Sequence, residues 1–259
     1  MAALWLGRKF PKKNGIPRSA CVTILPMYRV ALGAVCAACA SMGYAVRGRS
    51  STLLGPSVYH GCRDRRSMAL TFDDGPSEGT NQLLDILNHH RTPATFFVCG
   101  KNVQRLPGVA QAVAAGGHEI GNHTYSHPAL YLRTSRFIDD ELSAAQSIIT
   151  ETTGNSPTLF RAPFGARWFG LREAQRQSSL LGVMWTVLGR DWTLPAGRIE
   201  RRVLAGAENG AIICLHDGRG VSADPDIGAT LKAVGRLIPV LQSRGFTFET
   251  VSQLLCPIN

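Results

Sequence analysis

Met68-Ala-Leu-Thr-Phe-Asp-Asp-Gly-Pro76 is the stretch that decides the fold of this 259-residue chain. Its apolar residues and β-branched Thr predict a buried strand, which the Gly-Pro pair ends. The strand finishes in two adjacent carboxylates, Asp73 and Asp74. Because burial of an unpartnered charge is strongly destabilising, we expect a counter-charge nearby, and a metal ion is the simplest one. A turn in which one Asp caps the following helix is the alternative, and this stretch alone leaves both open.

Downstream of this strand, short apolar runs alternate with amphipathic helical patterns. We expect strands at residues 94–98, 118–121, 158–160, 182–187, 211–215 and 246–248, and helices near 81–87, 109–115, 135–152 and 227–244. Gly154 is expected to end the third of these helices. The alternation predicts β/α units arranged around a parallel sheet or barrel.

Charge is concentrated at the start of the chain. Residues 1–66 contain eleven Lys and Arg and one Asp, whereas the remainder contains 17 basic and 17 acidic residues. The globular part is therefore neutral, so the net charge of +10 does not indicate a nucleic-acid groove, and we expect no nucleic-acid partner. The seven cysteines show no zinc-ribbon spacing, and their odd number defines no disulfide framework.

Residues 30–46 form an uncharged, Ala-rich run between basic flanks. The run is at the lower limit for a membrane span, so we expect a signal anchor or the apolar region of a cleaved signal that starts at Met27. A buried helix of the soluble domain is the alternative. The larger upstream cluster of basic residues favours a cytoplasmic N-terminus, with the bulk of the chain exported or anchored outside the cytoplasm. The expected organisation is a basic tail at 1–29, the apolar segment at 30–46, a linker at 47–66 and a catalytic domain at 67–259.

Polar side chains follow directly on the carboxyl ends of five predicted strands. In parallel β/α folds these strand ends gather on one face, where active sites are built. We therefore expect the five groups to share one site: Asp73 with Asp74, His123 with His127, Arg161, Asp191 and His216.

The spacing of His123 and His127 suits a metal ion, because one turn of helix would place both imidazoles on the same side. An Asp oxygen added to two imidazole nitrogens makes a three-ligand site with open positions, which is the catalytic pattern. A metal held there would lower the pKa of a bound water and polarise a carbonyl oxygen.

Five ordered motifs then resemble a known family. TFDDGP (71–76), HTYSHP (123–128), RAPFG (161–165), RDW (190–192) and LHD (215–217) are similar to the motifs of the NodB-type polysaccharide deacetylases, carbohydrate esterase family 4. The resemblance covers residues 67–255. It implies a distorted (β/α) barrel with fewer than eight strands and metal-dependent removal of acetyl groups from N-acetylglucosamine-type sugars.

The resemblance also implies a division of labour at the metal. Asp73 looks like the general base, and Asp74, His123 and His127 look like the ligands of a divalent metal, usually zinc. Arg161 resembles the residue that holds the base in place, and such an ion pair would keep Asp73 charged.

Further roles follow from the third, fourth and fifth motifs. The backbone N–H of Phe164 is implied as an oxyanion donor, and His216 as the general acid whose pKa Asp191 would raise. Trp192 and Leu215 are candidates for the walls around the sugar and its acetyl methyl, with ordinary core packing as the alternative for each. The family's fourth motif commonly begins with Asp, and Leu188 stands at that position here.

The sequence leaves the substrate open between chitooligosaccharide and peptidoglycan. A deacylase of a lipid-linked sugar is a rival hypothesis, which the apolar N-terminal segment makes plausible. A metal-dependent amidohydrolase acting on a substrate without sugar is another. A carbohydrate-binding module that has lost its chemistry is a fourth, but it predicts at least one broken catalytic position, and all are present.

Overall fold

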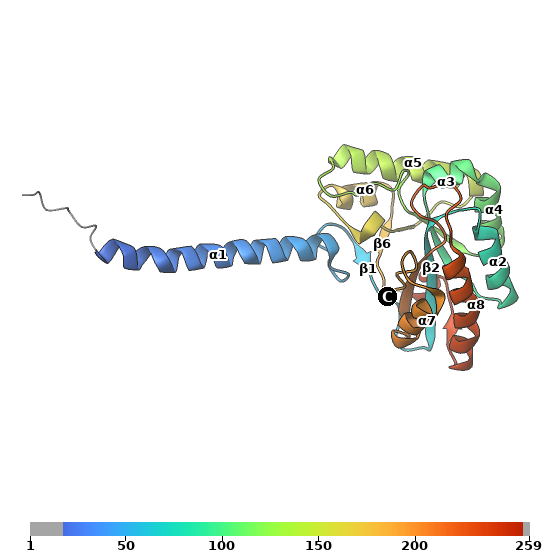
Figure 1. Ribbon diagram of the computed structural model, residues 1–259. Helices are drawn as coiled ribbons and strands as arrows, with labels where there is room; N and C mark the ends of the chain where they lie inside the picture. Colours follow the sequence, from blue (N-terminus) through green and yellow to red (C-terminus); the bar gives the residue numbers. More distant parts are fainter. Residues whose placement is uncertain (1–17, 256–259) are drawn as a thin grey trace, which may run out of the picture. The chain divides into compact units, whose positions relative to one another are not determined.

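The computed structural model describes residues 18–255, and the chain divides into two compact units, Met1–Gly43 and Tyr44–Asn259. Helix α1 extends over Arg18–Arg47 (Figure 1). Its part Arg29–Arg47 has a mean hydropathy of 1.5 and is 6% buried, so by length and composition it is able to cross a membrane. A signal sequence would have the same properties. The predicted apolar helix is therefore present.

The second unit is built on one parallel sheet, and β2 lies near its centre. All nine residues of β2 are buried, and the strand pairs with β3, β8 and β9. The strands follow the spatial order β1-β6-β5-β4-β3-β2-β8-β7, and β9 pairs with β2 off this path. They are β1 Ser57–Val58, β2 Ser67–Gly75, β3 Thr95–Val98, β4 Glu119–Asn122, β5 Leu159–Phe160, β6 Leu181–Val183, β7 Val187–Leu188, β8 Ala211–His216 and β9 Thr247–Phe248.

The sheet curls into an incomplete barrel, and β6 and β7 show why. We predicted one strand over 182–187, but this prediction is wrong: β6 lies near one end of the sheet and β7 at the other. Three residues, 184–186, connect them, so Val183 and Val187 are at most about 14 Å apart. The two ends of the sheet are therefore close. The predicted class, a distorted (β/α) barrel, is confirmed. Within the described residues its sheet has nine strands, most of them two to four residues long, whereas we expected fewer than eight.

Helices surround this sheet (Figure 1). The amphipathic face of α2 buries Leu83, Leu84 and Leu87, and α5 ends at Gly154, whose φ of 74° allows the left-handed cap that we predicted. Sequence reasoning missed α3, α6, α7 and α9. The helices are α2 Thr80–His89, α3 Gly100–Arg105, α4 Pro107–Ala115, α5 Ser135–Thr153, α6 Leu171–Gln177, α7 Ala196–Ala205, α8 Gly228–Ser243 and α9 Val251–Leu254.

Part of the segment predicted as a linker, 47–66, belongs to the folded domain. Its residues Ser57–Val58 form β1 and pair with β6. The buried guanidinium of Arg167 donates to the carbonyl oxygens of Gly48 and Ser51, so the start of the segment is held as well. Cys62 is disulfide-bonded, which the odd cysteine count did not predict. The linker prediction is corrected because long-range pairing, invisible in local composition, fixes these residues.

Candidate active site and metal centre

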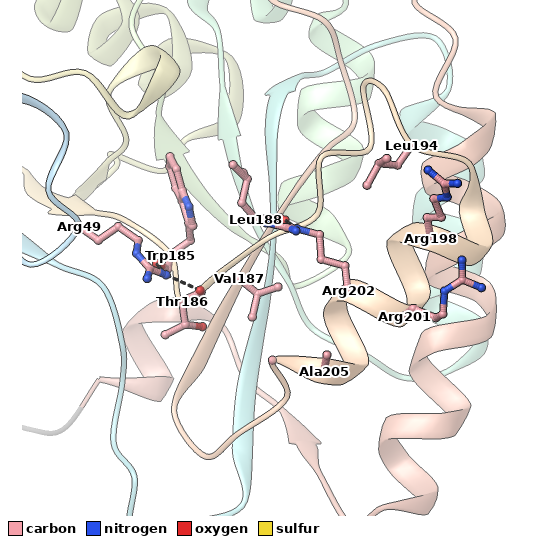
Figure 2. Close-up of a pocket in the computed structure, with 11 residues that line it drawn as sticks. Arg49, Trp185, Thr186, Val187, Leu188, Leu194, Arg198, Arg201, Arg202 and Ala205 are labelled. Carbon is pink, nitrogen blue, oxygen red and sulfur yellow. Dashed lines mark hydrogen bonds between the residues drawn. The ribbon is translucent and has the colours of Figure 1, made fainter.

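Among the hollows of the second unit, two adjoin each other and are large enough for a ligand. The larger one, about 780 Å³, is lined by arginines and contains none of the predicted site residues (Figure 2). The smaller one, about 580 Å³, is the candidate active site. It lies at the carboxyl ends of the strands, where β2 places Asp73 opposite His216 of β8. Its lining includes Asp73, Asp74, His123, His127, Phe164, Trp192 and His216.

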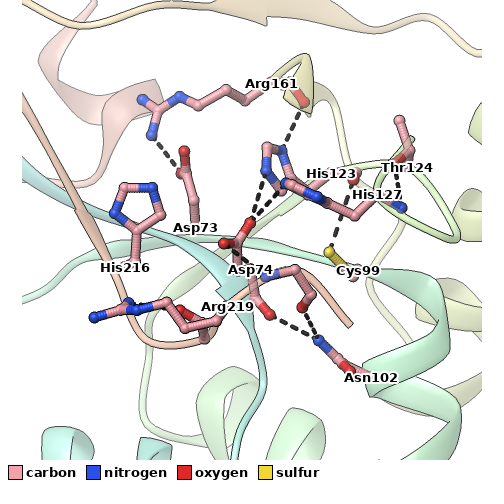
Figure 3. A network of polar contacts seen from close by, with 12 residues as sticks. Asp73, Asp74, Cys99, Asn102, His123, Thr124, His127, Arg161, His216 and Arg219 are labelled. Atoms are coloured by element: carbon pink, nitrogen blue, oxygen red, sulfur yellow. Dashed lines mark hydrogen bonds and ion pairs between the residues drawn. The ribbon is translucent and has the colours of Figure 1, made fainter. Parts of the chain in front are cut away.

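Asp74, His123 and His127 converge on one point (Figure 3). Oδ1 of Asp74 lies 3.2 Å from Nε2 of His123 and 2.9 Å from Nε2 of His127. Its other oxygen, Oδ2, accepts a hydrogen bond from the backbone N–H of Gly220 at 2.8 Å. These are the three side chains that the resemblance implied as metal ligands, and the structure brings them together into a group that could hold a metal ion.

The orientation of the His123 ring makes this cluster suitable for a cation. Its Nδ1 lies 2.8 Å from the carbonyl oxygen of Arg161. A carbonyl only accepts, so Nδ1 donates this hydrogen bond and Nε2 is the ring atom that faces Asp74. Oδ1 of Asp74 is buried between the two imidazoles. One carboxylate oxygen and two imidazole nitrogens that face one point are a donor set that suits a divalent metal.

Electrostatics keep the Asp74 carboxylate ionised. Burial alone would raise its pKa, but the hydrogen-bonding and charge interactions of His123 and His127 are together stronger and hold the pKa well below its usual value. A second group, Asp73 with Cys214 and His216, has similar spacing. Burial and the neighbouring carboxylates raise the pKa of the Cys214 thiol well above its usual value, and a protonated thiol is a poor metal ligand.

The two histidines are not on a helical turn, and that expectation is corrected. They lie in the loop that follows β4, where Thr124 and His127 have φ values of 66° and 58°. Glu141 of α5 fixes this loop by accepting the N–H of Tyr125 at 3.0 Å and that of Ser126 at 2.8 Å. Sequence reasoning missed Glu141 because the contact depends on how α5 packs.

Asn102 is another supporting residue that the sequence did not indicate. Its side-chain amide donates to the carbonyl oxygens of Asp74 at 2.7 Å and Gly220 at 2.8 Å. It therefore fixes the backbone of the Asp74 turn, where φ is 73°, against the loop that supplies the N–H for Oδ2. Asn102 lies in α3, which was not predicted.

Asp73 forms an ion pair with Arg161 and is not part of the group of Asp74, His123 and His127. The side chain is buried, and Oδ1 accepts a hydrogen bond from Nη1 of Arg161 at 2.6 Å. Arg161 is fully buried, donates to Thr71 Oγ1 at 2.7 Å and Val183 O at 3.1 Å, and stacks on the ring of Phe97 at 4.1 Å. These contacts fix the guanidinium, so the predicted pairing of Arg161 with Asp73 is present.

Half-buried His216 forms a second pair with buried Asp191. Nδ1 of His216 lies 2.8 Å from Oδ1 of Asp191, whose Oδ2 accepts the backbone N–H of His216 and the hydroxyl of Thr230. Burial would lower the pKa of His216, but Asp191, with smaller contributions from Asp73 and Asp74, raises it to about 9. The imidazole is therefore protonated at neutral pH. Thr230, which the sequence did not indicate, lies in α8.

Aromatic side chains stand at the mouth of the cavity. Phe164 is 58% exposed with its ring 4.8 Å from that of His127, and Trp192 is 43% exposed with its ring 5.0 Å from that of His216. Leu215 is different. It is fully buried in the main core cluster, whereas Leu188 lines the cavity, so the proposal that Leu215 forms a wall is corrected. The side chain of Leu215 points to the core because strand residues alternate in direction.

The fold and the site together define a hydrolase built on an incomplete parallel (β/α) barrel. Residues 60–183 match the family described as polysaccharide deacetylase. The chain is 39% identical over 198 residues to a chitooligosaccharide deacetylase of a Bradyrhizobium strain, a match that covers 73% of this chain and 90% of the relative. The chain therefore belongs to the polysaccharide deacetylase family, as the five motifs predicted.

Solved structures agree with this assignment. The peptidoglycan N-acetylglucosamine deacetylase Bc1960 superposes with a TM-score of 0.73 and 29% identity, covering 77% of this chain and 92% of that one. A family 4 pseudoenzyme of Bacillus anthracis, BA3943, superposes with a TM-score of 0.70 and 26% identity, covering 79% and 70%. The fold is thus that of carbohydrate esterase family 4.

Proposed function

We propose that this protein is a metal-dependent N-deacetylase that removes acetyl groups from N-acetylglucosamine-containing poly- or oligosaccharides of the chitooligosaccharide or peptidoglycan type. One observation carries the proposal: a carboxylate oxygen and two imidazole nitrogens meet in the cavity that is also lined by Asp73, which pairs with buried Arg161, and by a protonated His216. The amide bond hydrolysed is a non-peptide carbon–nitrogen bond.

The metal would be held by Asp74, His123 and His127. When bound, a divalent ion, expected to be zinc, supplies Lewis-acid polarisation of the acetyl carbonyl and of the attacking water. Asp74 keeps its charge for this purpose, and Asn102 and Gly220 prevent it from rotating away. The donor set of one carboxylate and two imidazoles leaves positions open for the substrate.

Proton transfers are assigned to the Asp73–Arg161 and His216–Asp191 pairs. Asp73, fixed by Arg161, accepts a proton from water as the water oxygen bonds to the acetyl carbon. The backbone N–H of Phe164 stabilises the charge that develops on the acetyl oxygen. His216, kept protonated by Asp191, gives its proton to the nitrogen as the carbon–nitrogen bond breaks. The products are acetate and a free amino sugar.

The sugar would lie between the exposed rings at the mouth of the cavity. Phe164 and Trp192 each border one part of the site, next to His127 and His216 respectively. A hexose ring packs against such aromatic surfaces through its apolar C–H face. The chemistry of the site fits both chitooligosaccharide and peptidoglycan.

The catalytic domain is proposed to act outside the cytoplasm, anchored by α1 or exported. The candidate span Arg29–Arg47 and the basic residues that precede it support this topology. The disulfide-bonded Cys62 also supports it, because disulfides persist in oxidising compartments.

A deacylase of a lipid-linked sugar is the second candidate function. One observation favours it: Arg47, the last residue of the candidate span, also lines the catalytic cavity. A span inserted in a membrane would thus end at a residue that lines the cavity. A carbohydrate-binding module without catalytic activity is disfavoured. BA3943 is a pseudoenzyme, but in this chain Asp73 has its partner Arg161 and His216 has its partner Asp191.

Acetate release from N-acetylglucosamine oligomers and from peptidoglycan by the full-length protein tests the proposal. Wild type, Asp74→Ala and the control Asp85→Ala, which changes an exposed carboxylate of α2, are compared with and without a chelator and added zinc. We expect release by wild type and Asp85→Ala, its loss in chelator, and no release by Asp74→Ala. No release from either substrate by the zinc-loaded wild type would contradict the proposal.

A further inference from the structure

The larger hollow beside the catalytic cavity is strongly basic (Figure 2). Arg49 lies on one side of it, and Arg198, Arg201 and Arg202 project from α7. These four arginines define what we call the arginine groove. Trp185 and Leu188 line both the groove and the catalytic cavity, so the two hollows adjoin. None of the predicted catalytic residues lines the groove.

The positive charge of the groove is not neutralised within the described residues 18–255. None of its four arginines forms an ion pair there, and Glu200, the single acidic residue of α7, instead pairs with Arg236 at 3.2 Å. All residues that line the groove are basic, apolar or neutral. An approaching ligand therefore meets four cations and no carboxylate.

Backbone contacts position two of these guanidinium groups. Arg49 donates to the carbonyl oxygens of Thr186 at 2.5 Å and Trp185 at 3.3 Å, and Nε of Arg202 donates to Leu188 O at 2.5 Å. Carbonyl oxygens orient a guanidinium without cancelling its charge, and each group has further N–H donors available. The arrangement pre-orients donors for a ligand.

The placement of the arginines on α7 is unfavourable in the absence of a ligand. Arg198 and Arg202 are four residues apart, and Arg198 and Arg201 are three apart, so like charges are neighbours on one helix face. Arg198 also lies in the first turn, where the helix dipole disfavours a cation. A bound anion would offset both the repulsion between the arginines and the unfavourable helix dipole. The cluster is therefore better explained by ligand binding than by a contribution to stability.

We propose that the arginine groove binds a phosphate or pyrophosphate group carried by the sugar substrate, while the acetyl group occupies the adjoining catalytic cavity. Guanidinium groups bind phosphate oxygens in pairs, so the neighbouring arginines of α7 match a group with at least two negative charges better than a single carboxylate. This inference rests on the proposed deacetylase function and narrows its substrate class.

Two sources supply this chemistry. Arg47 ends the candidate membrane span and Arg49, two residues later, lines the groove, so a phosphate that links a sugar to a membrane lipid is one source. A soluble sugar phosphate carries the same group. The phosphate is recognised in both cases, and the experiment distinguishes the carriers.

Binding of small probes to the zinc-loaded, full-length protein in detergent micelles tests the groove, and all variants carry Asp73→Asn so that zinc is kept but turnover is suppressed. Calorimetry compares N-acetylglucosamine 1-phosphate, N-acetylglucosamine and the monoanionic N-acetylmuramic acid. We expect the phosphate to bind about tenfold more tightly than either other sugar, and Arg198→Gln/Arg201→Gln to abolish this difference. The control Arg136→Gln/Arg176→Gln removes the same charge from exposed positions on α5 and α6 and should preserve it.

Two results would overturn the inference: equal affinity for the three sugars, or an equal loss in the control variant, which would indicate net charge alone. Failure of the deacetylase proposal is distinguishable, because it would abolish acetate release but leave the phosphate preference in the binding assay.

Turnover identifies the carrier. Acetate release is compared for N-acetylglucosamine 1-phosphate and for N-acetylglucosamine linked by pyrophosphate to a polyprenol in phosphatidylcholine vesicles. Each kcat/KM is divided by that of a neutral N-acetylglucosamine oligomer. We expect the groove variant to lower the ratio about tenfold for whichever carrier is preferred. An unchanged ratio for both carriers would overturn the inference.

Discussion

The catalytic cavity and the arginine groove adjoin, but in the part of the chain that the structure describes the catalytic side chains of the cavity are ion-paired, whereas the arginines of the groove are not. In the cavity, Arg161 pairs with Asp73 and His216 with Asp191, at 2.6 and 2.8 Å. In the groove, exposed arginines have carbonyl contacts but no acidic partner among the described residues. Buried charge must be paired to be tolerated, whereas exposed charge need not be. The difference teaches that the cavity's charges are part of the fold, while the groove's charges are available to a ligand.

Removal of Arg161 should produce the largest effect. Arg161→Met leaves the carboxylate of Asp73 buried and unpaired, so we expect the free energy of unfolding to fall by about 3–5 kcal/mol. Urea unfolding followed by circular dichroism measures the change. A loss below about 1 kcal/mol would show that the pair is not part of the fold, since losses of that size are ordinary for surface positions.

Asp191→Asn should change the pH dependence of the reaction. The carboxylate keeps the pKa of His216 at about 9, so in the variant the imidazole loses its proton at lower pH. We expect kcat at neutral pH to fall about tenfold to a hundredfold and its decline with rising pH to begin earlier. Acetate release measured across the pH range checks this. Identical pH midpoints in both proteins would contradict the assigned role of Asp191.

The same pair links stability to pH in the metal-free protein. Because folding raises the pKa of His216 from 6.5 to about 9, its contribution to the free energy of unfolding is fully present below pH 6.5. The contribution is lost as the pH rises through about 9. Urea unfolding of chelator-treated protein should show this loss in wild type and a smaller one in Asp191→Asn. An equal pH dependence in both would contradict the linkage.

Trp192→Ala should have a moderate effect confined to substrate binding. The ring is half exposed beside His216, so its removal leaves the core intact. We expect KM for an N-acetylglucosamine oligomer to rise about tenfold, with kcat within about threefold. A large fall in kcat with unchanged KM would place Trp192 with the proton-transfer groups instead.

Arg201→Gln should have the smallest effect on stability and so completes the comparison. The exposed side chain forms no ion pair within the described residues, and its removal relieves repulsion in α7. We expect the free energy of unfolding to change by no more than about 0.5 kcal/mol. A loss as large as that of Arg161→Met would show that the groove arginines are structural after all.

Much of the cavity could be predicted from the sequence because its residues follow strand ends. Asp73, Asp74, His123 and His216 each lie at or directly after the end of a strand, and His127 lies in the loop that begins at His123. The parallel sheet brings such positions together. The order of the five motifs along the chain also indicated the family. Local pattern was therefore enough to indicate both the fold class and the group of side chains.

The remaining features depend on long-range packing. The division of 182–187 into β6 and β7 depends on which strands flank each half, and β1 depends on pairing across more than a hundred residues. Glu141 and Thr230 reach the site only because α5 and α8 pack against it. The arginine groove was not predicted, since its members come from a segment before the sheet and from a helix that periodicity did not reveal.

The central claim is the separation of the base, Asp73, from the metal ligand, Asp74, although the two are adjacent in sequence. Zinc content and acetate release of Asp73→Asn and Asp74→Asn, measured side by side, test this most directly. We predict that Asp73→Asn retains about one zinc per chain but loses about a hundredfold or more in kcat, whereas Asp74→Asn loses zinc and activity together. Loss of zinc from Asp73→Asn, with zinc retained by Asp74→Asn, would contradict the account.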